Sequence, residues 1–282
     1  MIYLCSKNRI IRRFLEHIIY SNLVVSLSIG MLCWGICHQL HITKDEIYGI
    51  FVFASTLLTY NIQRLIKANQ QRQTPTNQVN WISAHKNWIY FLLLISGFTT
   101  AYYFFQLFQL RIEILFILGA SSLMSLLYVF KIKQISLREI PYLKIHIIAF
   151  VCIVAIGVVE LLNEHIFQLS KWGFVFIHYI YFLAITIPFD IRDVKFDSPK
   201  LKTIPQVFGV RKAVAISVFL YVLFLLYFVL FKTDIFKNPF FDASVLFTFL
   251  LLIKTNQTRK EFYFSGIIEA SIFVMGMSYV IT

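Results

Sequence analysis

The feature that most constrains this chain is a series of long apolar runs separated by short polar or basic segments. A helix needs about 20 mostly apolar residues to cross a membrane, so runs of this kind predict membrane-spanning helices. The runs occupy residues 18–37, 47–66, 87–107, 112–130, 143–162, 172–189, 213–231, 243–253 and 262–281. The sequence therefore predicts an all-α polytopic membrane protein with about nine transmembrane helices.

The composition excludes an ordinary soluble domain. Hydrophobic residues make up 59% of the 282 residues and charged residues only 14%, and the mean hydropathy is +0.73. Soluble domains average about 25% charged residues. The four cysteines are too few for a disulfide scaffold. No polar segment between the runs is long enough to fold alone, so residues 1–282 are expected to form a single transmembrane domain.

The basic residues predict the direction in which the chain crosses the membrane. Lys and Arg accumulate on the cytoplasmic side of membrane proteins. With the N-terminus in the cytoplasm, nine spans place all but five of the 26 Lys and Arg residues on that side, the exceptions being Lys44, Arg111, Lys171, Lys232 and Lys237. We therefore expect a multi-pass protein, typical of a bacterial inner membrane, with a cytoplasmic N-terminus. The net charge of +12 follows this topology and forms no single patch, so no nucleic acid partner is expected. An obligate protein partner is not predicted either.

An acidic cluster stands out in a chain that is poor in acids. Asp190, Asp193 and Asp197 follow the sixth apolar run in the segment DIRDVKFD. At 100° per residue these positions fall within about 60° of one helical face. Three like charges so close repel each other, so a cation is expected among them. The basic side chains of Arg192, Lys195 and Lys200 would make ordinary ion pairs, whereas a hard divalent ion such as Mg²⁺ would make this a functional site.

The segment that follows the cluster suggests a family. After DIRDVKFD the chain continues with KTIP at 202–205 and FG at 208–209, before the seventh run. In this order and position the chain resembles the UbiA-type membrane prenyltransferase superfamily, whose second acidic motif is followed by a basic residue, Thr, a hydrophobic residue, Pro and then Gly. The Tyr128 to Lys133 segment after the fourth run also resembles the Tyr and basic segment of that family.

The resemblance implies helices around a central cavity that opens toward the cytoplasm. It implies transfer of a prenyl group from a prenyl diphosphate to an aromatic or lipid acceptor. Mg²⁺ would be held by the catalytic carboxylates Asp190, Asp193 and Asp197, and the prenyl chain would lie in an apolar, aromatic-rich cavity. Carried over by position, the residues expected to bind substrate are Asn61, Arg64, Lys67, Tyr128, Lys131 and Lys202.

The first acidic motif of that family is missing. Members read NDxxDxxxD at the cytoplasmic end of the second span, where this chain reads NIQRLIKAN at 61–69. Ile62, Leu65 and Asn69 stand where the acids are expected. Arg64 and Lys67 lie between them, and these cations would repel a metal ion but could bind phosphate oxygens directly.

Several functions follow from this departure. In one account Arg64 or Lys67 replaces part of the metal charge in an active transferase. In a second, the chain has kept the fold and binds an isoprenoid lipid without transfer. A third account is that the alignment with the first acidic motif is shifted and that acidic residues elsewhere in the chain take its role. A transporter is a further alternative, although its site would usually lie near mid-membrane. Glu269 in the last run is an intramembrane acid, and either a functional role or a hydrogen bond to another helix would account for it.

Overall fold

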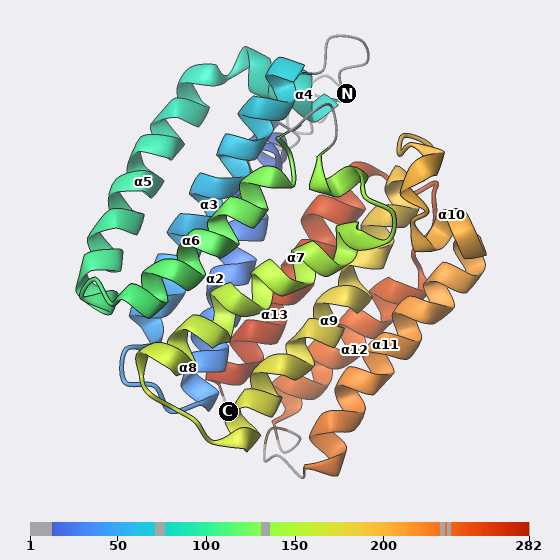
Figure 1. The fold of residues 1–282 in the computed structure, drawn as a ribbon. Helices are drawn as coiled ribbons and strands as arrows, with labels where there is room; N and C mark the ends of the chain where they lie inside the picture. Colours follow the sequence, from blue (N-terminus) through green and yellow to red (C-terminus); the bar gives the residue numbers. More distant parts are fainter. Residues whose placement is uncertain (1–12, 71–76, 131–135, 232–234, 236–237, 282) are drawn as a thin grey trace, which may run out of the picture.

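The computed structural model describes residues 13–70, 77–130, 136–231, 235 and 238–281, and every regular element in these segments is a helix (Figure 1). This agrees with the expected all-α class. The longer helices run roughly side by side, and the short α4 and α10 lie toward the same end of the molecule (Figure 1). The helices that build the body are α2 Leu23–Gln39, α3 Asp45–Gln70, α4 Asn77–Ala84, α5 Lys86–Phe108, α6 Ile112–Leu127, α7 Leu143–Ile153, α8 Val159–Asn163, α9 Leu169–Asp193, α10 Ile204–Phe208, α11 Val210–Leu230, α12 Pro239–Ile253 and α13 Glu269–Val280.

Short irregular helices join some of these elements. Two 3₁₀ helices, Leu137–Glu139 and Pro199–Leu201, lie in the segments before α7 and α10. Two π-helical segments, Val154–Val158 and Tyr263–Ile268, lead directly into α8 and α13. Because π segments inside helices are uncommon and often mark functional sites, the residues that follow them are of interest.

The number of membrane spans is not confirmed as nine. Five helices in the described segments are long and apolar enough to cross a membrane, or six if the bent pair Arg13–Tyr20 and Leu23–Gln39 forms one span. The α6 and α12 helices are apolar but have only 16 and 15 residues. The α3 helix has 26 residues, but polar and basic side chains occupy its C-terminal half. All nine predicted runs nevertheless lie on helices.

Glycines bring α2 close to two neighbouring helices. A Cβ atom built on Gly35 of α2 would lie 2.4 Å from the backbone oxygen of Gly276 in α13. A Cβ atom on Gly30 would lie 2.8 Å from the backbone oxygen of Gly49 in α3. Small residues permit such close backbone approach between membrane helices. The α2 helix is therefore held tightly between α3 and α13.

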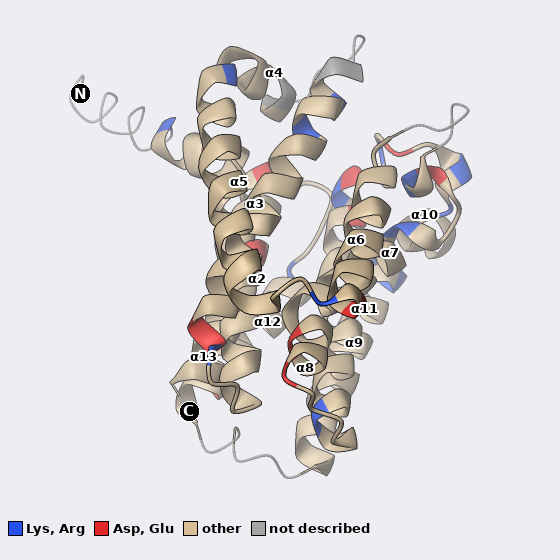
Figure 2. Cartoon of the chain, turned by 60° about the vertical axis from the view of Figure 1, so that its left-hand side comes forward, with Lys and Arg blue, Asp and Glu red and all other residues tan. Residues whose placement is uncertain are grey.

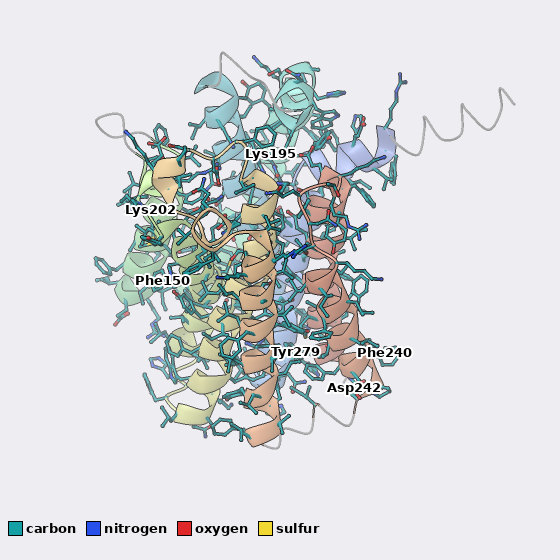
Figure 3. The ribbon with its side chains drawn as sticks, turned by 90° about the vertical axis from the view of Figure 1, so that its right-hand side faces the viewer. Phe150, Lys195, Lys202, Phe240, Asp242 and Tyr279 are labelled. Carbon is teal, nitrogen blue, oxygen red and sulfur yellow. The ribbon has the colours of Figure 1, made fainter. Side chains whose placement is uncertain are left out.

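The charged residues are distributed unequally between the two ends. Most of the Lys and Arg positions lie around α4, α7 and α10, in the upper half of the view (Figure 2). Lys195 and Lys202 lie toward this end, whereas Phe240 and Asp242 lie toward the opposite end (Figure 3). We call the end that carries α4 and α10 the basic end. Several apolar helices and this polarity are compatible with a multi-pass membrane protein.

Candidate functional site

A cavity of about 540 Å³ lies among the helices. Its walls come from α2, α3, α5, α6, α7, α8, α9 and α13, whereas α10, α11 and α12 contribute none of its lining residues. Val25, Ile29, Phe51 and Val52 make one part of the wall apolar. The charged side chains that line it at the basic end are Arg64, Lys67, Arg138, Lys144, Asp190, Arg192 and Asp193. The cavity thus combines a charged end with a mostly apolar interior.

The three aspartates of the acidic cluster converge on one lysine. The Lys144 ammonium lies 2.7 Å from Oδ1 of Asp190, 2.7 Å from Oδ2 of Asp197 and 3.9 Å from Oδ2 of Asp193. Only 8% of the Lys144 side chain is exposed. Lys144 stands at the start of α7, so the packing of α7 against α9 brings this cation to the carboxylates. The sequence-based expectation that a cation lies among them is met by Lys144.

Two arginines complete the cluster. The Arg192 guanidinium donates to both oxygens of Asp193, at 2.7 and 3.1 Å. Arg138 donates to Oδ1 of Asp197 at 2.8 Å. Burial opposes the charge of Arg138, but Tyr128 and Asp197 help to offset it, so the pKa of the guanidinium lies above its usual value. The three carboxylates are thereby matched by three cations.

Asp197 reaches the cluster from a turn, which corrects the expected single helical face. The α9 helix ends at Asp193. Pro199 lies six residues later and disfavours helical backbone at Ser198, the residue before it. Asp190 and Asp193 share the helix, and the backbone N–H of Asp197 donates to the carbonyl of Asp193 at 2.8 Å. Gln206 of α10 donates to the carbonyl of Asp197 at 3.2 Å. The KTIP segment therefore leads into α10, and Gln206 of that helix holds the turn.

Arg64 and Lys67 lie in the wall of the cavity, as cations able to meet a ligand. Both come from the C-terminal part of α3, one turn apart on the same helical face. In the part of the chain that the structure describes, neither side chain makes a hydrogen bond or an ion pair. Tyr128 also lines the cavity, directly after α6. These three expected substrate-binding residues are brought together with Asp190 and Asp193.

The other expected substrate-binding residues lie elsewhere. Asn61 is fully buried outside the cavity, where its amide donates to the carbonyls of Ser21 and Leu57 and accepts from Asn22. Lys202 borders a second, smaller hollow, which Lys144 and Asp190 also line. Lys131 lies outside the described residues. The structure therefore gathers only part of the expected set.

Sequence reasoning missed Lys144 and Arg138 as partners of the acidic cluster. It offered Arg192, Lys195 and Lys200 as ion-pair partners, and of these only Arg192 makes an ion pair with a described residue. Both missed residues precede the cluster by about fifty positions, in a different helix or loop. The sequence placed both residues in a predicted cytoplasmic segment. Many other Lys and Arg residues lie in such segments, so this position did not single out either residue.

The carboxylates of the acidic cluster have the donor atoms that Mg²⁺ prefers, but cations already contact them. Carboxylate oxygens are suitable ligands for this ion, which requires oxygens at about 2.0 to 2.1 Å in octahedral geometry. The Lys144 ammonium, however, already lies between the carboxylates, and within the described segments no group of three His, Cys, Asp or Glu side chains could hold a metal ion. The side chains as they lie do not fit Mg²⁺, so binding of this ion stays a prediction.

The comparisons with known proteins add no family. No protein-family model matches the chain, and neither a curated protein nor a solved structure is similar to it. The resemblance to the UbiA-type superfamily therefore rests on the motif residues and their spacing.

Proposed function

We propose that the protein is a UbiA-type integral membrane prenyltransferase, which transfers a prenyl group from a prenyl diphosphate to an aromatic or lipid acceptor. The observation that carries the proposal is the two-part cavity, in which Arg64 and Lys67 face a mostly apolar space. An amphiphile with an anionic head and an apolar tail matches this division. The basic end would face the cytoplasm, from which a diphosphate could enter.

The charges of the site suit the leaving group. When the allylic C–O bond breaks, negative charge develops on the departing diphosphate and must be stabilised. Arg64 and Lys67 make no ion pair with any carboxylate among the described residues, so their donors are available to phosphate oxygens. Tyr60, Phe104 and Phe189 also line the cavity and offer aromatic faces to the allylic cation.

A transfer assay tests the proposal. Purified protein is supplied with labelled prenyl diphosphates of several lengths, MgCl₂ and a panel of aromatic acceptors, and both diphosphate release and prenylated product are measured. Release with product formation is expected. If no acceptor is prenylated while labelled prenyl diphosphate still binds, the chain is a binding protein for isoprenoid lipids, in line with the missing acids at Ile62 and Leu65.

A pair of matched variants tests the role of the acidic cluster. Asp193→Asn removes the charge that holds Arg192 and should abolish transfer. Asp242→Asn makes the same chemical change at the exposed start of α12, toward the end opposite Lys195 (Figure 3), and should leave transfer unchanged. Equal turnover in the two variants would remove the cluster from the proposed site.

A further inference from the structure

Glu269 is a partly buried carboxyl group in the cavity wall that the ion-pair cluster does not use. It is the first residue of α13 and directly follows the π segment Tyr263–Ile268. It lines the same cavity as Arg64 and Asp190. In the segments that the structure covers, Glu269 makes no hydrogen bond and no ion pair, although it interacts electrostatically with Arg192 and Arg64. The intramembrane acid noted in the sequence is therefore not a hydrogen-bonded link between helices.

The position of Glu269 is fixed relative to the charged cluster. Ser265, one turn before it, accepts a hydrogen bond from Nη1 of Arg192 at 3.2 Å. Ser265 and Glu269 are four residues apart, about one helical turn along the chain. Glu269 thus borders the cavity about one turn deeper than the pair of Arg192 and Asp193. A ligand whose anionic head meets Arg64 and Lys67 would place the first carbons of its tail near this level.

Tyr60 places a second polar group in the cavity wall near Glu269. It stands one turn before Arg64 on α3, lines the cavity and interacts electrostatically with Glu269. No described residue forms a hydrogen bond with its hydroxyl group. Both groups border the cavity and bond to no described residue, so both are available to a polar group of a ligand there. Glu269 can accept a hydrogen bond there, and Tyr60 can donate or accept one.

We propose that Glu269 and Tyr60 form the acceptor subsite, in which Glu269 binds the hydroxyl group of a phenol or apolar alcohol and takes its proton. This inference rests on the proposed prenyl transfer and names the acceptor class. The C–O bond of the prenyl diphosphate breaks and its electron pair leaves with the diphosphate. A bond forms between the prenyl carbon and the acceptor, and the proton that the acceptor loses passes to the Glu269 carboxylate.

The test compares Glu269→Gln with a matched control. Gln keeps the size of Glu269 but cannot take a proton, and general bases contribute roughly 10² to 10⁴ in rate. We expect kcat for transfer to fall by at least about 100-fold, while binding of a labelled prenyl diphosphate stays unchanged. Glu164→Gln is the control, because Glu164 lies outside the cavity and its amide could still accept from Tyr48. This control should transfer at the normal rate.

Three outcomes would overturn the inference or separate it from the proposed function. Normal kcat in Glu269→Gln removes Glu269 as proton acceptor while leaving prenyl transfer in place. A parallel loss of prenyl diphosphate binding makes Glu269 a structural residue. Absence of transfer in the unmodified protein refutes the proposed function and this inference with it. If Glu269→Gln does not fold, Glu269→Asp keeps the carboxyl group and should retain measurable transfer, with the acidic limb of its pH profile displaced.

Discussion

At the scale of single residues, Lys144 is the centre of the acidic cluster. It contacts carboxylates on α9 and on the following turn, and it is almost fully buried. A buried charge that loses its partner is strongly destabilising, because the remaining charges stay away from water. The cluster is therefore expected to depend on this one ammonium group more than on any exposed lysine.

Replacement of Lys144 by Met tests this dependence. The variant leaves Asp190 and Asp197 facing each other without their shared cation, and we expect a loss of about 3 to 5 kcal/mol of stability, seen as a lower unfolding temperature in detergent. Lys195→Met is the control, since Lys195 is exposed and pairs with no described carboxylate. An equal unfolding temperature for both variants would show that the Lys144 contacts contribute little.

Magnesium provides a second measurement on the same variant. With the ammonium removed, Mg²⁺ could occupy the space between the carboxylates, and binding to the native state alone raises the unfolding temperature. We expect MgCl₂ to stabilise Lys144→Met more than the unmodified protein. Stronger stabilisation of the unmodified protein would mean that Mg²⁺ binds beside Lys144 or displaces it, as the family resemblance predicts.

At the scale of helices, the close contact of α2 and α13 supports the cavity wall that carries Glu269. The backbones of these helices approach each other at Gly35 and Gly276. A methyl group at either position would force the helices apart, because the nearest atoms are backbone atoms that cannot rotate away. The close packing of α2 between α3 and α13 thus depends on glycines at the contact points.

The matched pair Gly276→Ala and Gly119→Ala tests this packing. A Cβ atom on Gly276 would lie 2.5 Å from the carbonyl oxygen of Met31, whereas one on Gly119 meets nothing within 4 Å. Overpacking of this kind costs roughly 1 to 3 kcal/mol. Gly276→Ala should lower the unfolding temperature and Gly119→Ala should not. No difference between them would mean that α2 and α13 separate at little cost.

The sequence predicted where helices lie but not how they deviate from regular geometry. Apolar runs locate helices because a membrane leaves few other ways to satisfy backbone polar groups. No local sequence pattern predicted the bend of 55° between Arg13–Tyr20 and Leu23–Gln39 or the two π segments. Such deviations depend on the packing of neighbouring helices. Likewise, spacing brought Asp190 and Asp193 onto one face, but only the tertiary packing of α7 showed Lys144.

At the scale of the whole molecule, the uneven charge distribution predicts an orientation in the membrane. Lys195 and Asp242 lie toward opposite ends of the molecule (Figure 3). If the basic end faces the cytoplasm, a cysteine at position 242 should react with a membrane-impermeant maleimide in intact cells. A cysteine at position 195 should react only after permeabilisation. The reverse pattern would contradict the predicted topology.

The whole-molecule account also requires that head and tail of one ligand occupy one cavity. The measurement that tests this most directly is equilibrium binding of a non-hydrolysable prenyl thiolodiphosphate to the unmodified protein and to Arg64→Gln. A hydrogen bond to a charged group contributes about 1.5 to 3 kcal/mol, so Kd should rise roughly 10- to 100-fold. Lys212→Gln, an exposed change at the start of α11, should have no effect. Equal affinity in all three proteins, or no saturable binding at all, would contradict the account.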